Sequence, residues 1–129
     1  MEQITILVED KPGALADICE AFGRSGINIK SISAEGLGEA GIIRIITEDM
    51  NTAKRALERE GYSFSVSEIV PVRLMDRPGE LGKVARKLAD EGINIQCMYI
   101  LGKDKGMTDI ALRVSDVKGA KKALGKYLI

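Results

Sequence analysis

The sequence contains no histidine, only two cysteines, and few aromatic residues, which make up 4% of the chain. Without histidine the chain lacks the commonest general base and a common ligand of transition metals. It also contains no GxSxG, P-loop or HExxH motif. These absences argue against the hydrolases, nucleotide-binding enzymes and zinc enzymes that such motifs mark. We therefore expect no catalytic residues, no metal and no cofactor.

Charge and hydropathy narrow the class of partner. The 19 basic and 19 acidic residues give a formal net charge of zero, whereas nucleic-acid-binding surfaces are basic. RNA-binding sheets also carry aromatic side chains, and only Tyr99 lies on an expected middle strand. No apolar run approaches the roughly 20 residues of a membrane span, and residues 1–4 open a strand pattern rather than a signal peptide. Cys19 and Cys97 do not match between the repeats described below and fit reduced thiols. We expect a cytoplasmic protein that binds neither nucleic acid nor membranes.

The chain repeats itself. Asp-Lys-Pro-Gly-Ala-Leu returns 66 positions later as Asp-Arg-Pro-Gly-Glu-Leu, and Gly-Ile-Asn-Ile returns unchanged at the same offset. Three matched blocks occur in the same order: residues 10–15 with 76–81, 26–29 with 92–95, and 53–57 with 120–124. Such a repeat indicates two copies of one structural unit. We expect the first unit to span residues 1–69 and the second residues 70–129.

Hydrophobic periodicity predicts the same order of elements in both repeats. Ile4, Ile6 and Val8 alternate with their neighbours, as in a strand. A helical stripe follows, formed by Leu15, Ile18, Cys19 and Phe22, and Gly26 is placed to end that helix. Further strands are expected at residues 27–32, 42–47, 62–69, 70–75, 93–101 and 108–114, with later helices around residues 53–57, 81–88 and 118–126.

The order β-α-β-β-α-β predicts an α+β fold of two ferredoxin-like sandwiches, each with helices on one face of an antiparallel sheet. After residue 126 only Tyr127-Leu128-Ile129 remain, so the second repeat lacks most of its last strand. The strand at residues 70–75 would then be an open edge, and open edges are usually covered. We therefore expect a homodimer, since two-fold pairing is the commonest assembly of soluble chains.

Few side chains are candidates for a catalytic role. Asp49 and Asp116 match between the repeats, but each precedes an expected helix, so capping is favoured over catalysis. Asn51 is a further candidate cap.

The repeated turns are better candidates for a binding site. A proline at the first helical position, with a glycine beside it, would expose backbone N–H groups at the positive end of a helix, where a carboxylate binds well. Asn28 and Asn94, at the start of the second strands, offer polar groups for an ammonium ion. Each motif alone is also compatible with a tight turn or a local backbone hydrogen bond. Together they describe a pocket for a free amino acid.

Asp-x-Pro-Gly-x-Leu followed by Gly-Ile-Asn-Ile resembles the opening of an ACT domain, and the resemblance covers both repeats. It implies a module that binds an amino acid and regulates enzymes of amino-acid metabolism. In that family the effector lies between the strand-to-helix loop of one domain and the second strand of a facing domain. Carried over by motif, the ligand-binding residues are Asp10, Pro12, Gly13, Ala14, Asn28 and Ile29 in the first repeat, and Asp76, Pro78, Gly79, Glu80, Asn94 and Ile95 in the second.

One departure from the repeat affects the site. Glu80 replaces Ala14 and puts a carboxylate at the mouth of the second loop, where it would repel an effector carboxylate if it points inward. The first loop is therefore the better candidate. Since no enzyme is attached, the resemblance implies regulation of an enzyme in trans. The alternatives are a scaffold subunit without ligand and a small acylphosphatase-like enzyme, although the turn lacks the arginine that this chemistry needs.

Overall fold

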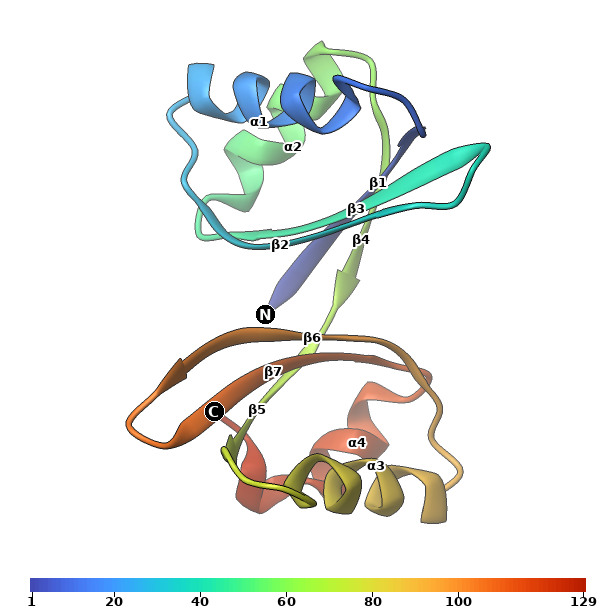
Figure 1. Ribbon diagram of the computed structural model, residues 1–129, viewed down its shortest axis with the longest axis vertical. Coiled ribbons are helices and arrows are strands. Elements are labelled where there is room, and N and C mark those ends of the chain that lie inside the picture. Colours follow the sequence, from blue (N-terminus) through green and yellow to red (C-terminus); the bar gives the residue numbers. More distant parts are fainter. The chain divides into compact units, whose positions relative to one another are not determined.

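The computed structural model describes residues 1–129 and divides into two compact units, Glu2–Ser67 and Glu68–Ile129 together with Met1 (Figure 1). The first unit contains β1 (Glu2–Glu9), α1 (Ala14–Arg24), β2 (Ile29–Gly36), β3 (Ala40–Thr47), α2 (Met50–Arg59) and β4 (Ser63–Glu68). The second contains β5 (Val70–Met75), α3 (Glu80–Asp90), β6 (Ile95–Asp104), β7 (Met107–Val114), α4 (Val117–Ala123) and the 3₁₀ turn η1 (Gly125–Tyr127). The predicted α+β fold of two ferredoxin-like units is confirmed.

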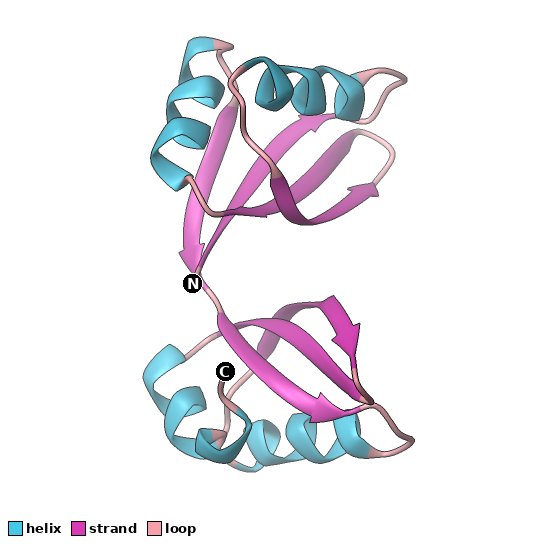
Figure 2. Cartoon of the chain, turned by 90° about the vertical axis from the view of Figure 1, so that its left-hand side faces the viewer, coloured by secondary structure: helices cyan, strands magenta, loops and turns pink.

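The first unit is a four-stranded sheet in the order β2-β3-β1-β4, with α1 and α2 on one face (Figure 2). Ile4 of β1 and Ile32 of β2 both pair with Ile45 of β3 in antiparallel register. Alternate strand residues face the helices because the side-chain period of a strand is two. The core consists mainly of Ile4, Ile6, Ile43 and Ile45 from the sheet and Ile18, Phe22, Ala53 and Leu57 from the helices.

Two details of the first unit differ from expectation. Leu15 was expected in the helical stripe, but its side chain is 42% exposed, whereas Ile18 and Phe22 are fully buried. Leu15 lies in the first turn of α1 and lines a surface hollow instead. Asn51 is not a cap, because α2 begins at Met50. Asp49 is the cap, accepting hydrogen bonds from the Thr52 backbone N–H at 3.1 Å and the Thr52 hydroxyl at 2.7 Å.

The second unit has three strands in the order β5-β7-β6 and no counterpart of β4, as predicted. Its core includes Val70, Val72, Leu74, Val84, Leu88, Ile110 and Leu112. The β5 edge is not fully open, however. Leu128 forms a single antiparallel bridge with Val72, and the Ile129 N–H donates to the Pro71 carbonyl at 3.3 Å. The last residues thus cover part of the edge that a fourth strand would occupy.

Turn chemistry explains where several elements end. Gly26, just after α1, has a φ of +70°, as expected for a glycine that terminates a helix. Lys105 and Gly106, with φ of +50° and +75°, form the tight turn between β6 and β7. Asp116 caps α4 by accepting from the Gly119 N–H at 3.0 Å, which confirms its predicted role. Both cysteines are unpaired and partly buried. No helix is long and apolar enough to cross a membrane.

Candidate functional site

The two Asp-x-Pro-Gly turns have the same conformation. Gly13 and Gly79 are the N-caps of α1 and α3, with φ of +92° and +88°. The prediction that proline occupies the first helical position is wrong, because each left-handed glycine follows the proline and the helix begins only after it. No side chain caps either helix, and no atom lies within 4 Å of where a Cβ would project from either glycine. Both helix N-termini are therefore approachable by an anion.

The equivalent aspartates of the two turns have different partners. The carboxylate of Asp10 accepts a hydrogen bond from the Gly38 N–H at 2.9 Å, and it lies against Gly36, where a Cβ would be 2.6 Å from Asp10 Oδ1. Asp10 thus ties the first turn to the β2–β3 hairpin. Asp76 instead forms an ion pair with Lys103 at 3.2 Å, and nothing lies within 4 Å of a Cβ built on Gly102. The second turn is thus tied to its hairpin in a different way, by this ion pair and by the Asp76 N–H, which donates to the Gly106 carbonyl at 2.8 Å.

A hollow of about 160 Å³ lies beside each turn, between the start of the helix and the hairpin. In the first unit its lining includes Asp10, Lys11, Ala14, Leu15, Glu35 and Gly41. The second hollow lies at matching positions, and its lining includes Asp76, Arg77, Glu80, Leu81, Ile100 and Thr108. The strand register makes Gly41 and Thr108 equivalent, because Gly41 pairs with Val8 and Thr108 with Leu74.

Glu80 is held in a way that removes the expected repulsion. Its side chain is 9% exposed and accepts hydrogen bonds from Arg77 Nε at 2.8 Å and Lys83 Nζ at 3.2 Å. The hydrogen bonds from Arg77 and then Lys83 hold the pKa of Glu80 below its usual range. Glu80 does point towards the hollow, but two cations compensate its one negative charge. The second loop is therefore not disfavoured for a carboxylate ligand.

Asn28 and Asn94 are exposed, and their backbones are held by hydrogen bonds to residues at the end of β3 and just after β7. The Thr47 hydroxyl donates to the Asn28 carbonyl at 3.0 Å, while the Asn94 N–H donates to the Ser115 hydroxyl at 2.9 Å and the Asn94 carbonyl accepts from the Ser115 N–H at 3.0 Å. Because these bonds fix the backbone, the asparagine side chains project from a defined position. Ile29 and Ile95 follow as the first residues of β2 and β6 and are half-buried.

A single unit does not bring its turn and its asparagine together. Glu9, next to the turn, pairs with Ala40, whereas Ile29, next to Asn28, pairs with Thr47. Residues 40 and 47 of β3 are seven positions apart, or about 23 Å at the usual rise of a strand. The second unit has the same arrangement, since Met75 pairs with Met107 and Ile95 with Val114. A ligand that contacts both motifs would need them from different units.

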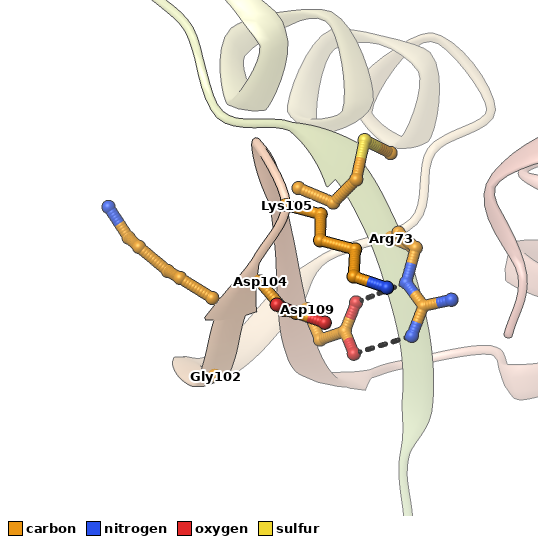
Figure 3. Close-up of a pocket in the computed structure, with 7 residues that line it drawn as sticks. Arg73, Gly102, Asp104, Lys105 and Asp109 are labelled. Atoms are coloured by element: carbon orange, nitrogen blue, oxygen red, sulfur yellow. Dashed lines mark hydrogen bonds and ion pairs between the residues drawn. The ribbon is translucent and has the colours of Figure 1, made fainter.

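A larger hollow, of about 430 Å³, lies elsewhere on the second unit, at the β6–β7 hairpin (Figure 3). Arg73 donates from Nε and Nη2 to the two carboxylate oxygens of Asp109 at 2.7 and 2.9 Å, across the β5–β7 pair. These hydrogen bonds lower the pKa of Asp109. Lys105 extends towards the same pair in Figure 3. Because Arg73 is already held at two points by Asp109, we interpret the cluster as a cross-strand link.

Sequence reasoning missed several residues at the second hollow. Arg77 and Lys83 were missed; each lies three positions from the predicted site residue Glu80, which is the spacing of helical ion pairs, so this signal was available. No sequence pattern marks Thr108, whose hydroxyl is buried without a hydrogen-bond partner.

Comparison with known proteins agrees with this geometry. Residues 1–124 match the family described as an ACT domain pair. The solved structure of protein BT0572 from Bacteroides thetaiotaomicron is 26% identical, with a TM-score of 0.88 over 97% of this chain and 86% of that one. The ligand-free regulatory subunit of aspartate kinase from Thermus thermophilus is 18% identical, with a TM-score of 0.71 over 97% and 91%. A structure of aspartokinase alpha and beta subunits is 22% identical, with a TM-score of 0.63 over 96% and 90%. The comparison with curated proteins found no match.

The fold and its repeated turns thus define a tandem pair of ferredoxin-like units. The chain belongs to the ACT domain pair family.

Proposed function

We propose that this protein is a cytoplasmic regulatory protein that binds a small amino acid and reports it to an enzyme of amino-acid metabolism in trans. The observation that carries the proposal is the turn that occurs twice. In each unit a left-handed glycine leaves an uncapped helix N-terminus open, next to a hollow large enough for an amino-acid side chain. The positive end of the helix suits the carboxylate of the ligand.

The asparagine motif supplies the other half of the proposed site. Asn28-Ile29 and Asn94-Ile95 would offer side-chain and backbone oxygens to the ammonium group. Since each turn lies about 23 Å from the asparagine of its own unit, we propose that the two halves come from facing units. Each complete site would thus combine Asp10, Pro12, Gly13 and Ala14, or Asp76, Pro78, Gly79 and Glu80, with the asparagine of another unit.

The proposed regulatory role is in line with the names of two similar structures. These are named as a regulatory subunit of aspartate kinase and as aspartokinase subunits. At such low sequence identity the similarity establishes only a shared fold. We therefore propose only the class of the regulated enzyme. Regulation requires an effector that binds one arrangement of the units better than another, and a coupling of about 1–3 kcal/mol is ordinary.

We further propose that the working form is a homodimer. A second copy would supply facing units and cover the exposed apolar residues near the edge strands, among them Met75, Met98 and Ile100, which are 50%, 41% and 56% exposed. Sedimentation equilibrium at micromolar concentration is expected to give twice the chain mass of 14.0 kDa. A mass of one chain across the concentration range would contradict the dimer and indicate that the Leu128 bridge suffices to close the β5 edge.

A thermal-shift screen of the twenty amino acids tests the function. Any ligand that binds only the folded protein raises its melting temperature, by an amount that grows with concentration. We expect one amino acid, or a few related ones, to do so. A screen without any shift would favour the scaffold alternative.

A further inference from the structure

The net charge of zero conceals two units of opposite charge. Residues 2–67 contain eleven acidic and seven basic side chains, which gives the first unit a formal charge of −4. Residues 68–129 contain eight acidic and twelve basic side chains, which gives the second unit a formal charge of +4. Seven of these twelve basic side chains lie on α3, α4 and η1. The second unit therefore has a basic helical layer that the composition of the whole chain does not reveal.

The charges of the two units are reversed at matched positions of their first helices. Asp17 and Glu20 on α1 correspond, at the repeat offset of 66, to Lys83 and Arg86 on α3. All four side chains are exposed, and both helices have the same length and a glycine N-cap. Since the same helix forms with either sign of charge, the fold does not require the basic residues of α3.

The outer side of the last helix consists of lysine. Ala120 and Leu124 are fully buried and belong to the core. The opposite side carries four exposed lysines, which we call the lysine face: Lys118, Lys121, Lys122 and Lys126. Their spacing of three or four positions places them on one side of the helix. No acidic residue follows Asp116 in the sequence, so this side of α4 and η1 carries positive charge alone.

The charge of the lysine face is little compensated within the chain. Lys121 forms an ion pair with Glu68 at 2.9 Å, and Lys126 Nζ lies 5.0 Å from the centre of the Tyr127 ring. Lys118 and Lys122 form no ion pair. Like charges three or four positions apart on a helix repel each other and destabilise it. The lysine face is thus unfavourable in the free protein and becomes favourable beside negative charge.

Two residues of α3 extend the positive surface. α3 and α4 lie on the same face of the sheet and contact each other (Figure 1). Arg86 and Lys87 of α3 are exposed and form no ion pair. Asp90, in the last turn, is the one exposed acidic side chain of this helix. The lysine face together with Arg86 and Lys87 therefore forms a mainly cationic surface.

This surface lacks what membranes and single-stranded nucleic acids require. A helix that lies in a membrane surface inserts an apolar side, but the apolar residues Ala120 and Leu124 already belong to the core. Nucleic-acid strands stack their bases on aromatic rings. The only aromatic residue of α3, α4 and η1 is Tyr127, which packs against the core. An acidic protein surface requires only complementary charge.

A second copy of the chain offers no matching acidic helices. On α2, Arg55 and Arg59 occupy the positions that correspond to Lys122 and Lys126, and the acidic residue Glu58 lies between them. The helices of the first unit thus mix both signs of charge. The cationic surface of the second unit fits a different protein with an acidic surface.

We propose that the lysine face, together with Arg86 and Lys87, is the surface through which this protein docks on an acidic surface of the enzyme that it regulates. The identity of the partner as an enzyme rests on the proposed function, and the inference assigns the contact to the helices of the second unit. Complementary charges of this kind speed association and exclude wrong partners more than they add affinity. The docking is therefore sensitive to salt.

The test uses the full chain and a decaglutamate peptide with blocked ends as the acidic probe. In NMR titrations at low salt, we expect amide shifts confined to α3, α4 and η1. The shifts should disappear at about 1 M salt, where charges are screened within about 3 Å. The double variant Lys118→Gln and Lys122→Gln is expected to bind the peptide at least about threefold more weakly, as for the loss of two exposed ion pairs. It should be at least as stable as the parent in chemical unfolding, because two repelling charges are removed.

The double variant Lys54→Gln and Arg55→Gln is the matched control. It removes the same charge from α2, at the positions that correspond to Lys121 and Lys122, and it is expected to bind the peptide as the parent does. Equal weakening in the two double variants, or shifts spread over both units, would overturn the inference. Tighter binding of a decathymidine oligonucleotide or of phosphatidylserine vesicles at the same lysines would overturn it in favour of a nucleic acid or a membrane.

The thermal-shift screen with amino acids separates this inference from the proposed function. The shifts seen with the parent protein are expected to be unchanged in Lys118→Gln and Lys122→Gln, since neither residue belongs to the proposed amino-acid site. A docking surface that fails the peptide test therefore leaves the amino-acid sensor standing. If no amino acid binds the parent protein, the sensor function falls, while the peptide titration still decides whether the second unit docks on an acidic partner.

Discussion

Replacing Gly79 or Gly13 by valine is expected to weaken amino-acid binding at the altered turn by at least about tenfold, or about 1.4 kcal/mol. A branched side chain there would project into the open space at the helix N-terminus that the ligand carboxylate must enter. In titration calorimetry, each single variant is expected to lose binding at the altered turn and to keep binding at the other turn. The double variant is expected to bind no amino acid.

Backbone strain alone must be separated from this effect, because valine is disfavoured at a φ of about +90°. Gly61→Val provides the control. Its φ is +78°, the space around it is equally open, and it lies outside the proposed site residues. All three variants should lose stability to a similar degree in thermal unfolding. Normal affinity in a folded Gly13→Val and Gly79→Val double variant would rule out the turns as the carboxylate site.

Gly36→Ala is expected to destabilise the first unit by about 1–2 kcal/mol, through loss of the hydrogen bond between Asp10 and Gly38. The new Cβ would lie 2.6 and 2.7 Å from the two oxygens of the Asp10 carboxylate. Asp10 would have to turn away, which would release the β2–β3 hairpin from the turn. Chemical unfolding of the full chain measures the change.

A glycine of the β6–β7 hairpin, Gly102, is the control; by strand register it corresponds to Glu35, the neighbour of Gly36. Gly102 has nothing within 4 Å of its Cβ position, so Gly102→Ala is expected to change stability by about 0.5 kcal/mol or less. In the Asp10→Ala background the Gly36→Ala penalty should largely vanish, since the two changes act on one contact. Equal penalties in Gly36→Ala and Gly102→Ala would show that the Asp10 contact does not stabilise the hairpin.

Much of the fold was predictable because local signals and the repeat agree. Alternation around Ile4 and Ile6 identified a core strand, and the left-handed glycine at position 26 ended the helix as expected. The missing fourth strand of the second unit followed from the repeat alone. Leu15 was misassigned because helical spacing says which residues share a face, but not how far along the helix the core extends.

The site was only partly predictable. The glycines that open both helices were found, since glycine is the residue that readily adopts a left-handed turn. The proline was placed two positions too far into the helix, because the glycine after it, and not the proline, is the residue next to the first helical position. The different partners of Asp10 and Asp76, and the unpaired hydroxyl of Thr108, depend on contacts between residues far apart in sequence, and no local pattern records them.

Titration calorimetry of the parent chain with each of the twenty amino acids tests the central claim most directly. The account predicts saturable binding of at least one amino acid, with binding lost in the double variant Gly13→Val and Gly79→Val and kept in Gly61→Val. A folded parent protein that releases no heat of binding with any of the twenty, and whose melting temperature none of them shifts, would contradict the account.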